Sequence, residues 1–148
     1  MRFLGYGLIL TAIFTAALAH ETWILPPSGS AGVAETVSFD VTSGMEFPAP
    51  ESPIRIERIA RAAYRQGGET GAITRMESAP TSLVLRHAFS KPGVAMVWVD
   101  LKPRDIDLKD DEVAEYLDEI GALESLRALW AERKGRVPWH ETYTKHAK

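Results

Sequence analysis

Alternation of apolar and polar residues predicts a series of short β-strands in the middle of the chain. Between residues 35 and 42, Val37, Phe39 and Val41 occupy every second position, which is the period of a strand with one buried face. The same criterion predicts strands at residues 54–59, with a continuation to Tyr64, and at residues 83–89 and 94–99.

Segments rich in proline, glycine and serine separate these strands. Residues 43–53 are expected to form a loop, and residues 66–72, which include three glycines, a turn. The Ser-Lys-Pro-Gly turn at residues 90–93 predicts a hairpin between the two strands that flank it. Apolar residues cover both faces of the strand at 94–99, so we expect this strand to lie in the centre of its sheet.

Apolar residues return at helical spacing in the segment 110–134. The first predicted helix begins at Asp110 or Asp111 as N-cap and ends at Gly121; the second precedes a polar tail. The apolar stripes of the two helices consist of Val113, Tyr116, Leu117 and Ile120, and of Leu123, Leu126, Leu129 and Trp130. The whole pattern predicts a mainly β protein, an immunoglobulin-like antiparallel sandwich with an appended short helical hairpin, in a single domain over residues 20–148.

Residues 1–19 have the three parts of a secretory signal peptide. Arg2 supplies the positive charge, residues 3–18 form the apolar centre, and Ala17 and Ala19 are the small residues at −3 and −1. An uncleaved anchor is the alternative, because the apolar run is close to the length of a membrane span. The Ala-x-Ala ending favours cleavage after Ala19, which would leave no stable membrane span.

Composition narrows the class of protein further. Apolar residues make up 45% and charged residues 25%, values that exclude a disordered, collagen-like or multi-pass membrane protein. The chain has no cysteine, which excludes a disulfide framework; export without cysteine favours the bacterial periplasm. The net charge is −3, whereas nucleic-acid-binding proteins carry an excess of basic residues. No nucleic-acid partner is therefore expected.

Known catalytic and cofactor-binding motifs are missing from the sequence. There is no G-x-S-x-G, Walker loop, G-x-G-x-x-G or H-E-x-x-H segment, and no cysteine nucleophile. An enzymatic function is therefore unsupported, and no organic cofactor is expected.

His20 is the candidate metal ligand. Cleavage after Ala19 would make it the mature N-terminus, where the free α-amine and the imidazole together can chelate Ni, Co or Cu ions. The alternative is that histidine stands at the junction by chance. For His87, inside a predicted strand, a packing role is favoured over metal ligation.

Three segments resemble a known family. They are Ala-His-Glu-Thr-Trp-Ile-Leu-Pro at residues 19–26, Gly-Val-Ala-Met-Val-Trp-Val at 93–99 and Glu-Thr-Tyr-Thr-Lys-His-Ala-Lys at 141–148. In this order they resemble the bacterial periplasmic domain-of-unknown-function family 4198, whose members are described as NikM-like and associated with nickel or cobalt uptake. The resemblance implies a periplasmic β-sandwich whose partner is a membrane component of metal uptake. His20 is the only metal ligand that the resemblance implies for this chain. Because family members continue beyond the third segment, we expect the chain to be truncated at its C-terminus.

Two functions from different classes follow from the sequence. The first is an exported, non-enzymatic protein that binds a divalent transition metal through His20 and assists its uptake. The second is a metal-free envelope interaction module that docks a partner through a sheet edge or the helical hairpin, or a non-functional fragment of a longer family member.

Overall fold

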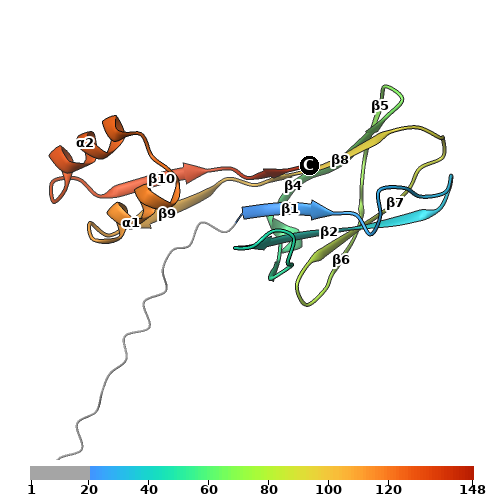
Figure 1. Cartoon of the computed structure of the whole chain (residues 1–148), viewed down its shortest axis with the longest axis horizontal. Coiled ribbons are helices and arrows are strands. Elements are labelled where there is room, and N and C mark those ends of the chain that lie inside the picture. Colours follow the sequence, from blue (N-terminus) through green and yellow to red (C-terminus); the bar gives the residue numbers. More distant parts are fainter. Residues whose placement is uncertain (1–20) are drawn as a thin grey trace, which may run out of the picture.

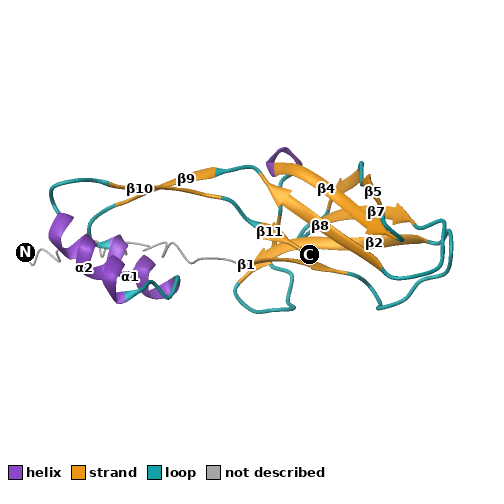
Figure 2. Cartoon of the chain, turned by 90° about the horizontal axis from the view of Figure 1, so that it is seen from above, coloured by secondary structure: helices purple, strands orange, loops and turns teal. Residues whose placement is uncertain are grey.

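Two antiparallel sheets packed face to face form the larger part of the molecule, and a smaller lobe projects from one end (Figures 1 and 2). The computed structural model describes residues 21–148, so the predicted signal peptide over 1–19 and the candidate ligand His20 lie outside the described residues. The predicted fold class, a mainly β antiparallel sandwich with a short helical hairpin, is confirmed.

The first sheet forms because its strands present alternate apolar residues to the interior. Val37, Phe39 and Val41 are buried, and Phe39 and Val41 pair across the sheet with Leu85 and Leu83. Full burial of such a side chain stabilises the fold by about 1.5–3 kcal/mol. The strand order is β1 (Glu21–Leu25), β2 (Thr36–Gly44), β7 (Leu83–Ala88) and β6 (Arg75–Ser78), with β3 (Ser52–Pro53) also paired to β2.

The second sheet covers the apolar face of the first. Ala62, Val97, Val99 and Ala147 of this sheet are buried in the same hydrophobic cluster as Leu85. Its strand order is β11 (His146–Ala147), β8 (Ala95–Leu101), β4 (Ile59–Gln66) and β5 (Glu69–Ala72), so β8 lies inside its sheet, as predicted.

The projecting lobe, which we call the finger, spans residues 104–143 (Figure 1). It consists of a two-stranded ribbon, β9 (Arg104–Leu108) and β10 (Trp139–Tyr143), and of the helices α1 (Glu112–Glu119) and α2 (Glu124–Arg133). The finger has its own hydrophobic cluster, made of Leu108, Val113, Leu117 and Trp130. The ring of Trp130 packs edge-on against Trp139 with centroids 5.3 Å apart.

Both predicted helices form, and α1 ends as predicted. Gly121 follows α1 with a φ of 60°, a conformation that glycine adopts without steric cost. Asp111 is the N-cap residue of α1, as predicted, but its side chain makes no capping hydrogen bond. Instead, the backbone N–H of Lys109 donates to the Glu112 carboxylate at 2.8 Å.

Two predicted strand assignments are wrong. Residues 83–99 do not form a hairpin, because β7 and β8 belong to different sheets and the turn at 90–93 passes from one layer to the other. Alternation specifies the buried face of a strand but not its partner. The strand predicted at 54–59 begins only at Ile59, and Ile56–Arg58 (η1) form a single 3₁₀ turn in which Ile56 is exposed.

Three segments predicted to lack regular structure contain strands. The loop predicted at 43–53 contains the last two residues of β2 and the whole of β3. The turn predicted at 66–72 is confined to Gly67 and Gly68, both with positive φ, and β5 follows at once. The predicted polar tail after residue 134 contains β10 and β11. Three of the five residues of β10 are polar, so its apolar content is too low to reveal a strand.

Candidate functional site

The chain enters the sandwich at Glu21, the residue that follows the candidate ligand His20. Glu21 is the first residue of β1 and pairs with Gly44 of β2. Its carbonyl oxygen accepts a hydrogen bond from the Ser43 hydroxyl at 2.8 Å. A mature chain that begins at residue 20 would therefore carry a single residue before an ordered edge strand.

Two carboxylates lie close to this entry point. Glu21 itself is exposed, and the carboxylate of Glu51 lies against Gly44, the strand partner of Glu21. The Glu51 carboxylate accepts the backbone N–H of Met45 at 2.9 Å, which holds it in place.

His87 has a packing environment, as the sequence favoured. Its ring stacks on Tyr64 at 4.1 Å between centroids and meets Phe89 edge-on at 4.7 Å. Burial lowers the pKa of His87 below its ordinary value of 6.5, because it disfavours the charged imidazolium. The neutral ring is part of the aromatic border of the sandwich core.

The other two histidines form separate pairs with aspartates. His140 Nδ1 lies 2.8 Å from the Asp107 carboxylate across the finger ribbon, and the hydrogen bond to Asp107 raises the pKa of His140. His146 Nδ1 lies 2.7 Å from Asp100 across β11 and β8. Within residues 21–148 no group of three or more histidine, aspartate or glutamate side chains is arranged to hold a metal ion. These histidines therefore do not supply a second cluster of ligands.

A cleft lined by basic residues separates the base of the finger from the sandwich. This basic cleft has a volume of about 910 Å³. Burial lowers the pKa of Lys145, the positive charges of Arg104 and Arg58 lower it further, and the negative charge of Glu21 raises it. Thr22 and Ser43 also line the cleft, so β1 enters the fold beside positive charge. Glu57 and Asp105 also line the cleft, so two carboxylates partly balance its four basic residues.

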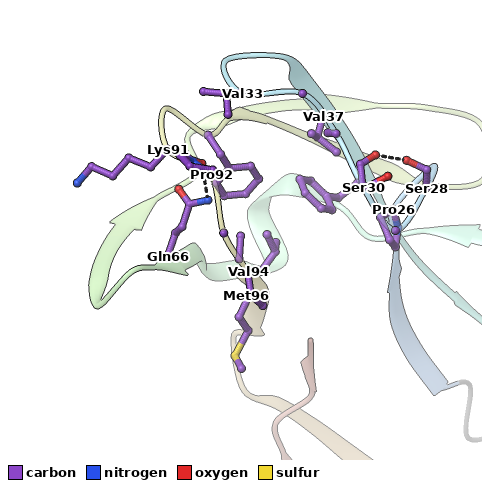
Figure 3. Close-up of a pocket in the computed structure, with 18 of the residues that line it drawn as sticks. Pro26, Ser28, Ser30, Val33, Val37, Gln66, Lys91, Pro92, Val94 and Met96 are labelled. Atoms are coloured by element: carbon purple, nitrogen blue, oxygen red, sulfur yellow. Dashed lines mark hydrogen bonds between the residues drawn. The ribbon is translucent and has the colours of Figure 1, made fainter.

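A second depression lies at the opposite end of β1, between the two sheets. This apolar groove has a volume of about 810 Å³ and is bordered by the loop after β1, by β2 and by β8 (Figure 3). Val37 and Phe39 of β2 and Val97 of β8 contribute to its lining. Val94 and Met96, at the rim, are 91% and 53% exposed. With the apolar lining of the groove they form one continuous apolar surface, which is a feature of interaction sites.

Comparison of the chain with protein-family models, with curated proteins and with solved structures found no match. In the described part of the chain, no helix is long and apolar enough to cross a membrane.

Sequence reasoning missed both the basic cleft and the apolar groove. The cleft brings together Arg55 and Arg58 with Arg104 and Lys145, which are far apart in the chain. The groove had one visible signal, the apolar run at residues 94–99. That run predicts a strand inside its sheet, and the structure leaves its residues Val94 and Met96 exposed.

Proposed function

We propose that the protein acts outside the cytoplasm as a non-enzymatic protein that binds a divalent transition metal at its mature N-terminus and assists metal uptake. One observation carries this proposal: β1 begins at Glu21, directly after the predicted cleavage junction and His20. A terminus held by an edge strand presents its amine and imidazole with little conformational freedom to lose on binding. The resemblance of residues 19–26 to the NikM-like family supports the same function.

The chemistry of the donors selects the metal. An α-amine and a neutral imidazole are nitrogen ligands, which favour Ni(II), Co(II) and Cu(II), and copper binds most tightly in the general order of affinities. The amine must lose its proton for ligation, so affinity should rise with pH toward the amine pKa of about 8. A membrane component of metal uptake is the partner that this function requires.

The test begins with the exported protein and its intact mass, which must correspond to a chain starting at His20. Calorimetric titration with Ni(II), Co(II) and Cu(II) should then show one binding site. His20→Ala and a protein acetylated at its N-terminal amine should each lose it, because each removes one of the two donors. His140→Ala, which removes an exposed histidine of the finger, is the matched control and should bind as the wild type does. Unchanged binding in both N-terminal variants would contradict the proposal.

A metal-free interaction module is the second candidate function. The apolar groove with its exposed Val94 and Met96 favours it, since neither residue contributes to the sandwich core. The two candidates are separable, because metal binding depends on His20 and docking in the groove does not.

A further inference from the structure

The basic cleft at the base of the finger brings together cationic side chains from three separate parts of the chain. Arg55 and Arg58 lie at the two ends of the η1 turn, Arg104 begins β9, and Lys145 lies between β10 and β11. After Lys145 the chain enters β11 and runs along β8 away from the cleft. The cations of the cleft therefore belong to the junction between the finger and the sandwich.

Backbone contacts fix the positions from which these side chains extend. Arg58 Nη1 donates to the carbonyl oxygen of Pro103 at 3.3 Å, which places the guanidinium beside Arg104. The carbonyl oxygen of Lys145 accepts the N–H of Leu101 at 2.9 Å. Three cationic residues are thus held where β8 ends and β9 begins, before any ligand is present.

The positive charge of the arginines is not neutralised within the described part of the chain. Among residues 21–148, no carboxylate forms an ion pair with the three arginines of the cleft. Of the two carboxylates in the lining, Asp105 accepts a hydrogen bond from the Thr142 hydroxyl at 2.6 Å, and Glu57 is exposed. The four cations exceed these two carboxylates, so the field of the cleft attracts anions.

Lys145 responds to this excess of positive charge. Burial lowers its pKa and the charges of Arg104 and Arg58 lower it further, whereas Glu21 acts in the opposite direction. The ring of Tyr143 lies 5.8 Å from Nζ of Lys145. An anion in the cleft favours the charged ammonium and therefore raises the pKa of Lys145 again.

The rest of the lining indicates the kind of anion. Thr22, Ser52 and Tyr143 contribute hydroxyl groups, and the half-buried Ile54 and Ile106 contribute apolar surface. Guanidinium groups bind carboxylates and phosphates through paired N–H donors. A volume of about 910 Å³ is in the range of sites that bind small organic molecules. An organic anion with several acidic groups matches this combination of charge, hydroxyls and apolar surface.

We propose that the basic cleft binds a small organic anion with two or more acidic groups, a polycarboxylate or a phosphate ester, between Arg58 and Arg104 and beside Lys145. The site uses neither the amine nor the imidazole of residue 20, so it is a further function and does not rest on metal binding. Arg58 belongs to the sandwich and Arg104 to the finger, so the bound anion links the two lobes.

Calorimetric titration of the exported protein at low salt tests the proposal. Metal is first removed with EDTA, and the EDTA is then removed by dialysis. The probes are citrate for polycarboxylates, glycerol 2-phosphate for phosphate esters and acetate as the monovalent control. One of the first two probes should bind saturably and at least about tenfold more tightly than acetate, because it engages several charged donors. Whichever of the two binds more tightly identifies the class of the ligand.

Substitutions at Arg104 test the paired N–H donors. Arg104→Gln should weaken binding of the tighter probe by about tenfold or more, and Arg104→Lys, which keeps only the charge, should give an intermediate affinity. Arg136→Gln removes an exposed arginine of the finger outside the cleft and is the matched control. Glu57→Gln should strengthen binding by about twofold to fivefold, because it removes a negative charge from the lining. A gain of affinity does not result from a damaged fold.

An NMR titration of the lysine side chains locates the bound anion. At saturating probe the pKa of Lys145 should rise, whereas the ε-methylene signal of Lys134, at the end of α2, should not respond. Three outcomes would overturn the proposal. They are equal affinities for acetate and both multivalent probes, equal binding by Arg104→Gln and Arg136→Gln, and a pKa of Lys145 that is the same with and without the bound probe.

Discussion

The hydroxyl of Tyr116 donates a hydrogen bond to the Glu141 carboxylate at 2.8 Å and thereby joins α1 to β10 across the finger. Burial raises the pKa of Tyr116 to about 12, and the hydrogen bond and negative charge of Glu141 act in the same direction. The phenol is therefore a neutral donor to an anionic acceptor, which is the stronger kind of hydrogen bond.

Tyr116→Phe should lower the free energy of unfolding by about 1–2 kcal/mol, because Glu141 loses its donor in a half-buried position. Urea denaturation checks this value, and Tyr143→Phe is the control in the same ribbon. The raised pKa means that the contribution is present below pH 10 and is lost as the pH rises through about 12. Equal destabilisation by both variants would show that the hydrogen bond is unimportant.

Thr42→Val should destabilise the sandwich by about 1–3 kcal/mol. Thr42 is fully buried, and its hydroxyl lies 2.7 Å from the carbonyl oxygen of Thr81, which a valine would leave without a donor. Thr36→Val, an exposed change on the same strand, should alter stability by less than about 0.5 kcal/mol. A thermal or urea unfolding series compares the two, and similar midpoints would refute the prediction.

His87→Phe should reduce the loss of stability in mild acid. The pKa of His87 is lowered in the folded protein, so its contribution is present above pH 6.5 and is lost as the pH falls below that value. Phenylalanine keeps the aromatic contacts with Tyr64 and Phe89 and removes the titrating group. Urea midpoints measured from about pH 7.5 to about pH 5 should fall less steeply for the variant than for the wild type.

The imidazole of His140 should titrate above pH 6.5 in an NMR experiment, because Asp107 favours its charged form. The interaction strengthens the fold below pH 6.5 and is lost as the pH rises through the raised pKa. Asp107→Asn should move the pKa of His140 down toward 6.5, whereas Asp111→Asn, elsewhere in the finger, should leave it in place. A pKa of His140 that does not respond to Asp107→Asn would contradict the structure.

Local patterns predicted the elements whose apolar residues repeat without interruption. The spacing of Val113 and Leu117 identified α1, and the alternation from Val37 to Val41 identified β2. β10 was missed because Glu141 occupies the face of the ribbon that meets α1. The Tyr116 hydroxyl donates to this carboxylate, and that contact depends on the tertiary structure.

The two candidate sites differ in how much of each can be predicted from the sequence. The role of His20 depends on a cleavage event rather than on the fold, so it stays a prediction from sequence and a proposal here. The apolar groove depends on which strands pair with β8 and how far the pairing extends. The alternation of apolar residues does not reveal how far a neighbouring strand extends. The sequence around Val97 would alternate in the same way if a full-length strand paired with β8.

The position of the finger within the chain has a consequence for the order of folding. β8 and β11 are antiparallel neighbours, yet the whole finger separates them along the chain. Once β9 has paired with β10, Arg104 lies opposite Tyr143. Only a loop of a few residues must then close to bring Leu101 within hydrogen-bonding distance of Lys145. The shorter closure saves about 1–2 kcal/mol of loop entropy. Formation of the finger thus brings Ala147 close to its place in the sandwich core.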